Sequence, residues 1–325
     1  MKLLVTGAAG FIGFSFCNSL LQNNKVKLLV GIDNLNSYYS EDLKIKRLKV
    51  LQKYKNFHFK KIDLSDLNKI NNLFKYNKFD IVINFAAQAG VRYSFTNPKS
   101  YFDSNVIGFQ NVINAAVKYK VKKFIFASSS SVYGENKSYP LTESSKLMPK
   151  NIYSLSKQEN EIAANIVSKY SNIKFICLRL FTVYGPFGRP DMFIMKYINA
   201  SLNNKKFELY NYGNHYRDFT YVDDVIGFVK KLVFKRIKEN FSIFNICSSK
   251  PIKLSVIISE LNKYVKKPKI IKKPLHHADV LKTHGSNKKI IAYTKINKFT
   301  SIKEGISKTV RWYLNNKNFL IKAFK

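Results

Sequence analysis

Residues 7–13 read Gly7-Ala8-Ala9-Gly10-Phe11-Ile12-Gly13 and join a short apolar run, Lys2–Thr6, to a segment of helical periodicity, Phe11–Leu21. Glycines at such spacing between a strand and a helix are typical of a loop that binds a dinucleotide. The first permits a tight turn, the second lets the backbone approach a pyrophosphate, and the third lets helix pack on strand. An ordinary strand–turn–helix is the alternative, but the position after a buried strand favours dinucleotide binding.

Polar residues at the ends of the following strands complete the predicted cofactor site. Asp33 ends the second strand, 20 residues after Gly13. A carboxylate there can accept hydrogen bonds from the adenosine ribose and repels a 2′-phosphate, so the sequence predicts NAD rather than NADP. The residues predicted to contact this cofactor are Gly7, Gly10, Phe11, Ile12, Gly13, Asp33, Asn34, Asp63, Leu64, Ala86, Gln88, Tyr153 and Lys157.

Strand-like and helix-like segments alternate over residues 1–180. This alternation predicts an α/β fold, a Rossmann-type doubly wound parallel sheet with helices on both faces. The expected strands are Lys2–Thr6, Lys27–Ile32, Phe57–Lys60, Asp80–Phe85, Lys123–Ala127 and Lys174–Leu180. The expected helices are Phe11–Leu21, Glu41–Tyr54, Ser65–Phe74, Pro98–Tyr119 and Ile152–Tyr170.

The alternation weakens after residue 180, where turn-rich segments interrupt it. Residues 181–325 are therefore predicted to form a smaller mixed α/β domain that binds the substrate. Segment 219–246 is ambiguous, because it can also return to the first domain. Helices are expected at Phe193–Leu202, Asp223–Phe234, Leu254–Val265 and Ile302–Leu314.

The chain of 325 residues is strongly basic, with 56 Lys and Arg against 20 Asp and Glu and a formal net charge of +36. The basic residues are dispersed lysines, whereas surfaces that follow phosphates favour the arginine fork, so specific nucleic-acid binding is not expected. Arginine is rare and therefore informative. Four of the seven arginines lie in motifs described below: Arg92, Arg179, Arg189 and Arg217. Arg179 is expected at the edge of the core. The others are expected on the surface: Arg47, Arg236 and Arg311.

Hydrophobicity and cysteine usage indicate a cytoplasmic protein. No apolar run is long enough for a membrane-spanning helix, and Gly7 and Gly10 interrupt the first apolar run too early for a secretion signal. Cys17, Cys177 and Cys247 are odd in number, far apart and set in apolar runs. Buried free thiols are the expectation, and no metal site is predicted.

Tyr153 and Lys157 lie four positions apart at the start of a predicted helix and so share one face. An ammonium beside a phenol favours the phenolate, so we expect the pKa of Tyr153 to lie below its ordinary value of about 10. Tyr153 can then act as a general base. Ser128–Ser131 follow the fifth strand at the same sheet edge, and Ser129 or Ser130 is predicted to assist. A polar loop and a half-buried helix face are the alternatives, but the glycine loop favours a catalytic Ser–Tyr–Lys set.

Several stretches beyond these motifs carry a family resemblance. They are GIDNLN at 31–36, AAQAGVRYS at 86–94, ASSSSVYG at 127–134, FTVYGPFGRPDM at 181–192 and RDFTYVDD at 217–224. With them the chain resembles the extended short-chain dehydrogenases/reductases of the nucleotide-sugar epimerase/dehydratase family, and it is most similar to UDP-glucuronate 4-epimerases. The resemblance implies bound NAD, a C-terminal domain that binds a UDP-sugar, and a homodimer.

The residue before Val132 distinguishes the branches of this family. Dehydratases and decarboxylases carry an acid before the VYG motif that helps to process the 4-keto intermediate, whereas Ser131 stands there in this chain. The resemblance therefore favours epimerisation at C4, most of all of UDP-glucuronate to UDP-galacturonate. A 4-epimerase of a neutral sugar, UDP-glucose or UDP-N-acetylglucosamine, and an NAD-binding scaffold without activity stay open as alternatives.

The resemblance also assigns roles at the substrate end. Arg217 is expected to pair with the pyrophosphate, and Thr182, Arg189 and Arg92 are expected at the sugar. In the family a PGDV-like segment is followed by Ala-Asp and helps to close over the nucleotide. Here these positions read His277-Ala278-Asp279-Val280 and Gly285-Ser286. The adjacent His276 and His277 are expected on the surface.

Overall fold

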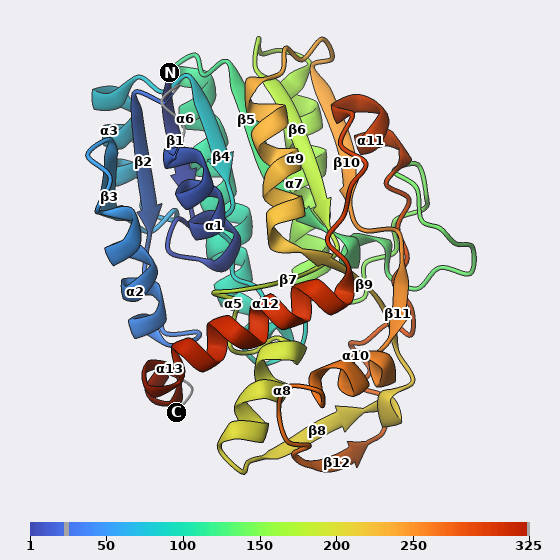
Figure 1. Ribbon diagram of the computed structural model, residues 1–325. Coiled ribbons are helices and arrows are strands. Elements are labelled where there is room, and N and C mark those ends of the chain that lie inside the picture. The colour runs from blue at the N-terminus through green and yellow to red at the C-terminus, as the bar shows by residue number, and fades with distance from the viewer. Residues whose placement is uncertain (23–25, 324–325) are drawn as a thin grey trace.

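A computed structural model describes residues 1–22 and 26–323. Its centre is a seven-stranded parallel sheet in the order β10-β6-β5-β4-β1-β2-β3 (Figure 1). The strands are β1 (Lys2–Thr6), β2 (Leu28–Asp33), β3 (Phe57–Lys61), β4 (Ile81–Asn84), β5 (Lys123–Ser129), β6 (Lys174–Leu180) and β10 (Phe241–Ile246). The order reverses direction between β1 and β4, so a crevice opens at the carboxyl ends of these strands.

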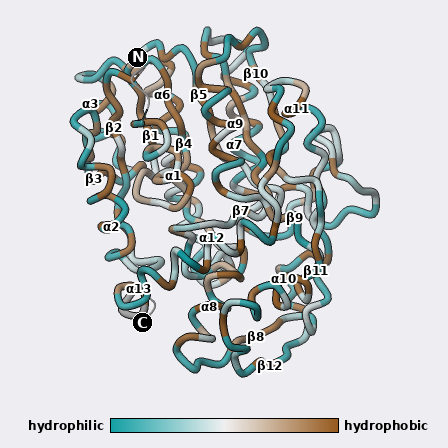
Figure 2. The backbone as a smooth tube through the Cα atoms, viewed as in Figure 1, coloured by the Kyte–Doolittle hydropathy of each residue, from teal (hydrophilic) through white to brown (hydrophobic). Residues whose placement is uncertain are grey.

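Helices cover both faces of the sheet, as the alternating pattern predicted. One face carries α1 (Phe11–Leu21), α2 (Glu41–Leu51) and α9 (Val222–Phe234), and the other carries α3 (Leu67–Asn77), α6 (Gly108–Lys118) and α7 (Ile152–Ser168). Successive residues of a strand point to opposite faces. Accordingly Leu3 and Val5 of β1 pack with the first set of helices and Leu4 with the second. Figure 2 shows the apolar colouring concentrated in the central strands.

The ambiguous segment 219–246 contributes to the large sheet. Strand β10 pairs in parallel with β6, from Phe241 beside Phe175 to Ile246 beside Leu180. Helix α9, which precedes β10, packs against α1. The large sheet therefore extends past the first 180 residues of the chain.

The remaining elements form a smaller layer below the carboxyl ends of the sheet (Figure 1). One small sheet joins β7 (Thr182–Tyr184), β9 (Tyr216–Tyr221) and β11 (Pro251–Lys253), and another joins β8 (Lys206–Tyr210) and β12 (Lys269–Lys273). The helices here are α8 (Phe193–Leu202), α10 (Leu254–Leu261), α12 (Ile302–Asn315) and α13 (Lys317–Ala323), whereas α11 (Lys288–Thr294) packs beside β10 and α9.

The helix predicted at Pro98–Tyr119 is present as a continuous helical run over 98–118, with a π-helical segment inside it. It is divided into α5 (Pro98–Tyr101), a π-helical segment η1 (Phe102–Ile107) and α6, after the short α4 (Tyr93–Thr96). Asn105 lies in this π-helical segment, and its side chain is buried. It accepts from the backbone N–H of Gln88 at 2.7 Å and donates to the carbonyl of Gln88 at 3.1 Å and to the hydroxyl of Ser156 at 3.0 Å. These contacts draw the helix toward the crevice.

Buried groups in the core bear out two of the expectations and contradict a third. Cys17, Cys177 and Cys247 are buried free thiols, as expected. Arg179 is 2 % exposed at the core edge. The prediction that Arg47 lies on the surface is wrong, because its side chain on α2 is fully buried.

Candidate active site

A cavity of about 950 Å³ lies at the crevice formed by the carboxyl ends of the sheet. It brings together every residue that the sequence assigned to cofactor, substrate or catalysis. These are Gly7, Gly10, Phe11, Ile12, Gly13, Asp33, Asn34, Asp63, Leu64, Ala86, Gln88, Arg92, Ser129, Ser130, Tyr153, Lys157, Thr182, Arg189 and Arg217. Elements from both the large sheet and the smaller layer therefore form one continuous site.

The glycine loop has the close backbone approaches that its sequence predicts. Gly7 has a φ of +68°, and a Cβ on it would lie 2.7 Å from the backbone nitrogen of Ala86. A Cβ on Gly13 would lie 2.1 Å from the carbonyl oxygen of Gly7. No larger residue fits either position, so the loop stays tight and the first turn of α1 faces the cavity with its free N–H groups.

The carboxylate of Asp33 lies next to this loop. It accepts from the backbone N–H of Leu35 at 2.8 Å and of Ala9 at 3.3 Å. Burial raises the pKa of Asp33, and the charges of Lys44 and Arg47 act in the opposite direction. Its acceptor oxygens at the end of β2 fit the ribose of a dinucleotide.

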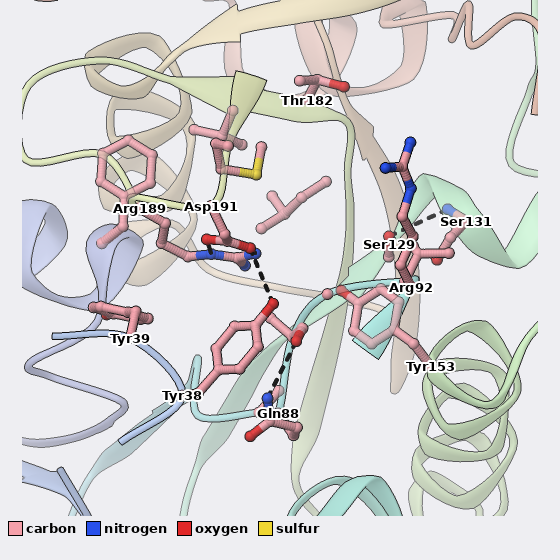
Figure 3. Close-up of a pocket in the computed structure, with 18 of the residues that line it drawn as sticks. Tyr38, Tyr39, Gln88, Arg92, Ser129, Ser131, Tyr153, Thr182, Arg189 and Asp191 are labelled. Atoms are coloured by element: carbon pink, nitrogen blue, oxygen red, sulfur yellow. Dashed lines mark hydrogen bonds and ion pairs between the residues drawn. The ribbon is translucent and has the colours of Figure 1, made fainter. Parts of the chain in front are cut away.

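Ser129 and Tyr153 form the reactive end of the cavity (Figure 3). The hydroxyl of Ser129 hydrogen-bonds the phenol of Tyr153 and accepts from the Ser131 hydroxyl at 2.9 Å. Of the two serines that the sequence left open, Ser129 is therefore the one in contact with Tyr153. Ser128 is excluded from the reactive end, because its buried hydroxyl donates to the Glu161 carboxylate at 2.5 Å.

The predicted fall in the pKa of Tyr153 is wrong. Burial raises the pKa of this phenol, and the Ser129 hydrogen bond and the charge of Arg189 compensate only in part. Lys157 is not among the groups that lower the pKa of Tyr153, and its Nζ donates to the Ala127 carbonyl at 2.9 Å. Burial also lowers the pKa of Lys157 to about 8. The four-residue spacing correctly predicted that Tyr153 and Lys157 both lie in the cavity. Desolvation, however, shifts the pKa of each group more than the other group does.

Behind these groups, a buried ion pair joins α7 to β6. Arg179 donates to both oxygens of Glu161, at 3.0 and 2.7 Å, and to the hydroxyl of Tyr133 at 2.9 Å. Glu161 lies one helical turn after Lys157 and also holds Ser128. The pair therefore fixes the helix of the catalytic residues against the end of the sheet.

Arg189 lines the cavity and is already paired. Its guanidinium donates twice to the carboxylate of Asp191, which also accepts from the hydroxyl of Tyr38 at 3.0 Å. Figure 3 shows Tyr38 pointing toward this pair. Burial alone would raise the pKa of Asp191, but Arg189 and Tyr38 hold it below its usual range.

A second group of polar residues also lines the cavity. Arg92 donates to Asp279 at 2.8 Å and stacks on Tyr210, with 3.6 Å between guanidinium carbon and ring centroid. Asp279 belongs to the segment that departs from the family pattern, so this acid keeps a role despite the neighbouring Ala278. Arg217 faces the same space, and burial lowers its pKa to about 10.

The second departure also has a structural explanation. The backbone N–H of Gly285 donates to the Asp218 carboxylate at 3.2 Å, and Gly285 forms an isolated bridge with Leu141. A Cβ on Gly285 would lie 2.4 Å from the ring of Phe181 and 2.8 Å from the sulfur of Cys247. Alanine, the family residue, therefore does not fit here.

Two buried residues that support the cavity lining, and one that lines the cavity, escaped the sequence reasoning. Arg47 and Asn105 lie on helices and gave no local signal. His215 is 2 % exposed and lines the cavity. Its Nε2 lies 3.9 Å from Asp279, and this nitrogen has no hydrogen-bond partner among the described residues. Burial lowers the pKa of His215 to about 4, so this imidazole is neutral.

The chain belongs to the NAD dependent epimerase/dehydratase family, which matches residues 3–247. The UDP-glucuronate 4-epimerase of Thermodesulfobacterium geofontis is 36% identical to it, over 99% of this chain and 98% of that protein. The fold is similar to that of Bacillus cereus UDP-glucuronic acid 4-epimerase in complex with UDP-glucuronic acid and NAD, with a TM-score of 0.92 and 30% identity over 97% of this chain and 99% of that chain.

A neutral-sugar enzyme is also similar. The UDP-glucose 4-epimerase of Thermotoga maritima has a TM-score of 0.87 and 27% identity, covering 98% of this chain and 100% of that chain. Within residues 1–22 and 26–323, no helix has the length and hydrophobicity to cross a membrane, and no three His, Cys, Asp or Glu side chains gather as metal ligands.

Proposed function

We propose that this protein is an NAD-dependent UDP-glucuronate 4-epimerase that interconverts UDP-glucuronate and UDP-galacturonate through a 4-keto intermediate. One observation carries the proposal. A single cavity holds the glycine loop, the hydrogen-bonded Ser129 and Tyr153, and the guanidinium of Arg189. These groups fit, in that order, a dinucleotide, a sugar hydroxyl and a sugar carboxylate.

Tyr153 accepts the proton of the C4 hydroxyl, and Ser129 holds the same oxygen by a hydrogen bond. Lys157 orients the ribose next to the nicotinamide. Bound NAD would supply the hydride acceptor for C4 and, once reduced, the hydride donor, and its positive nicotinamide would favour the Tyr153 phenolate. Between the two transfers the 4-keto sugar has to rotate about its pyrophosphate linkage, so that the hydride returns to the opposite face of C4. Arg217 holds the pyrophosphate, and Thr182 and Arg189 bind the sugar. Tyr153 then returns a proton to the C4 oxygen of the epimer.

Retention of the carboxylate separates this reaction from decarboxylation. A 4-keto uronate is a β-keto acid and loses CO₂ readily. Position 131 holds a serine that hydrogen-bonds Ser129 rather than an acid. The acid nearest to the sugar end, Asp191, is held by Arg189. The site therefore has no free acid beside Ser129 to process the intermediate.

The Arg189–Asp191 pair also favours a second candidate, a 4-epimerase of a neutral UDP-sugar. A guanidinium that already binds a carboxylate has less attraction for another one, and Asp191 repels a uronate. Incubation of the purified protein with UDP-glucuronate, UDP-glucose and UDP-N-acetylglucosamine, followed by separation of the C4 epimers, decides between them. UDP-galacturonate as main product supports the proposal, and turnover of a neutral sugar alone rejects it.

We propose further that the protein is a cytoplasmic homodimer. Leu155, Ile162 and Ile166 are exposed on one face of α7, and Phe102 and Ile107 are exposed on the adjacent η1. A continuous apolar face of this kind is typical of a subunit contact. Light scattering should give twice the mass of one chain, and Ile162→Glu should shift it toward the monomer. A reducing cytoplasm suits the three free thiols.

A further inference from the structure

Arg47 is buried far from the reacting end of the cavity, yet its guanidinium connects three parts of the site. One nitrogen, Nη1, donates to the carbonyl of Ala9 in the glycine loop at 2.8 Å and to the hydroxyl of Tyr39 at 2.8 Å. The other, Nη2, donates to the carbonyl of Phe187 at 2.6 Å and more weakly to that of Gly188 at 3.5 Å. Cofactor loop and sugar loop therefore share one donor group.

Burying this guanidinium is costly in stability for a residue with only a structural role. The side chain is fully buried, and all four acceptors are neutral oxygens. Nε, also buried, has no hydrogen-bond partner among the described residues. Arg47 interacts with the charge of Asp33 but donates no hydrogen bond to a carboxylate among the described residues, and taking a guanidinium out of water in this way costs stability. This burial points to a use in the site.

The segment that Arg47 holds carries the sugar-binding guanidinium. Phe187 has a φ of +59°, which is unusual for a residue with a side chain, and its ring packs against Phe14 of α1 and Trp312 of α12. The Arg47 hydrogen bond fixes the carbonyl of this strained residue. Arg189 follows two positions later, so the backbone position from which its side chain enters the cavity depends on how the Phe187 carbonyl is held.

The same connection reaches Arg189 from a second side. Tyr39, which accepts from Arg47, adjoins Tyr38, and the hydroxyl of Tyr38 donates to Asp191, the partner of Arg189. Arg47 thus holds the main chain before Arg189. It also holds the loop of Tyr38, whose hydroxyl donates to Asp191, the carboxylate paired with Arg189.

We propose that Arg47 is a positioning residue that sets the distance between the sugar-binding Arg189 and the cofactor loop. The inference rests on the proposed function, because it takes Arg189 to bind the uronate carboxylate. Arg47 itself touches neither ligand in this account. Its action goes through the Phe187 carbonyl, and only a substrate that uses Arg189 should sense it.

The test compares Arg47→Lys, which keeps the charge but loses the fork, with Arg236→Lys, an exposed arginine on the same protein. Holoenzyme kcat/KM for UDP-glucuronate should fall roughly ten- to hundredfold, the scale for a misplaced substrate-binding group. The inhibition constant of UDP-glucose, the NAD content and the Tm should stay near those of Arg236→Lys. Equal weakening of both sugars, or parallel loss of NAD, would overturn the proposal.

Two further variants guard against a loss of folding. Tyr39→Phe removes only one acceptor of Arg47 and should give a smaller fall in kcat/KM for UDP-glucuronate. An unchanged kcat/KM in this variant would count against the proposal. In a cycle with Arg189→Lys, the double variant should lose less than the product of the single losses, whereas independent losses overturn the inference. Failure of the proposed function is distinguished by a separate result: the wild-type protein would form no UDP-galacturonate from UDP-glucuronate.

Discussion

The guanidinium of Arg189 and the carboxylate of Asp191, two residues apart, face each other in a fork: Nε lies 2.9 Å from Oδ1 and Nη2 lies 2.5 Å from Oδ2. About a fifth of the Arg189 side chain is still exposed, 21%, toward the cavity. Asp191 therefore orients the arginine and leaves donors free on its outer side. Under the proposed function, a sugar carboxylate would share this guanidinium with the protein's own acid.

Arg189→Lys should affect the acidic sugar far more than the neutral one. Lysine cannot bind Asp191 and a substrate carboxylate with the same planar fork. We expect kcat/KM for UDP-glucuronate to fall tens-fold, about 1.5–3 kcal/mol, with a much smaller change for UDP-glucose. Equal losses on both sugars would remove the case for Arg189 as the carboxylate ligand and direct attention to Arg92.

Tyr153→Phe should retain NAD and fold but lose turnover by roughly 10²–10⁴-fold, the usual loss on removal of a general base. Because burial raises the pKa of Tyr153, the wild-type rate should increase with pH as the phenol ionises. Steady-state rates across the neutral and alkaline range test this, and the residual rate of the variant should lack that dependence. A variant of near-native rate would reject Tyr153 as the base.

Gly285→Ala should destabilise the fold, although alanine is the residue expected from the family. Its Cβ would meet Phe181 and Cys247 at 2.4 and 2.8 Å, and overpacking of this kind costs about 1–3 kcal/mol. Gly227→Ala is the matched control, because a Cβ on this glycine of α9 meets nothing within 4 Å and should stabilise the helix. Urea unfolding of both variants measures the difference, and equal stability would show that the Gly285 pocket relaxes.

His215 should make the protein less stable in mild acid. Burial lowers its pKa to about 4, while an unfolded chain titrates near the ordinary value of about 6.5. The unfolded state therefore binds the proton first, and the stability from this residue is complete above about pH 6.5 and is lost as the pH falls toward 4. The fall in Tm from about pH 7 to 5 should be smaller for His215→Asn than for wild type. An identical fall in the two proteins would contradict the assignment.

The sheet was predictable because its signals are local. Strands β1 and β6 and helices α1 and α8 have the predicted bounds, since each is a distinct apolar or periodic run between turn residues. The glycine loop and the Tyr153–Lys157 spacing likewise placed their residues in the cavity, because both depend on the geometry of a single helix start.

The errors concern contacts that join distant parts of the chain. Arg47 is covered by a loop 140 residues further on, which helical periodicity cannot reveal. The periodicity of Pro98–Tyr119 predicted a helix but not the π-helical segment at Asn105, whose side chain hydrogen-bonds Gln88 and Ser156. The pKa of Tyr153 depends on its burial, on the Ser129 hydrogen bond and on the charge of Arg189, none of which a four-residue spacing specifies.

The central claim is that hydride leaves C4 and returns to the same carbon within one active site. UDP-glucuronate labelled with deuterium at C4 tests it most directly, with the products analysed by mass spectrometry and NMR. The account predicts UDP-galacturonate that keeps the deuterium at C4 and takes up no solvent hydrogen at any carbon. UDP-galacturonate with ordinary hydrogen at C4, or a pentose product formed with release of CO₂, would contradict it.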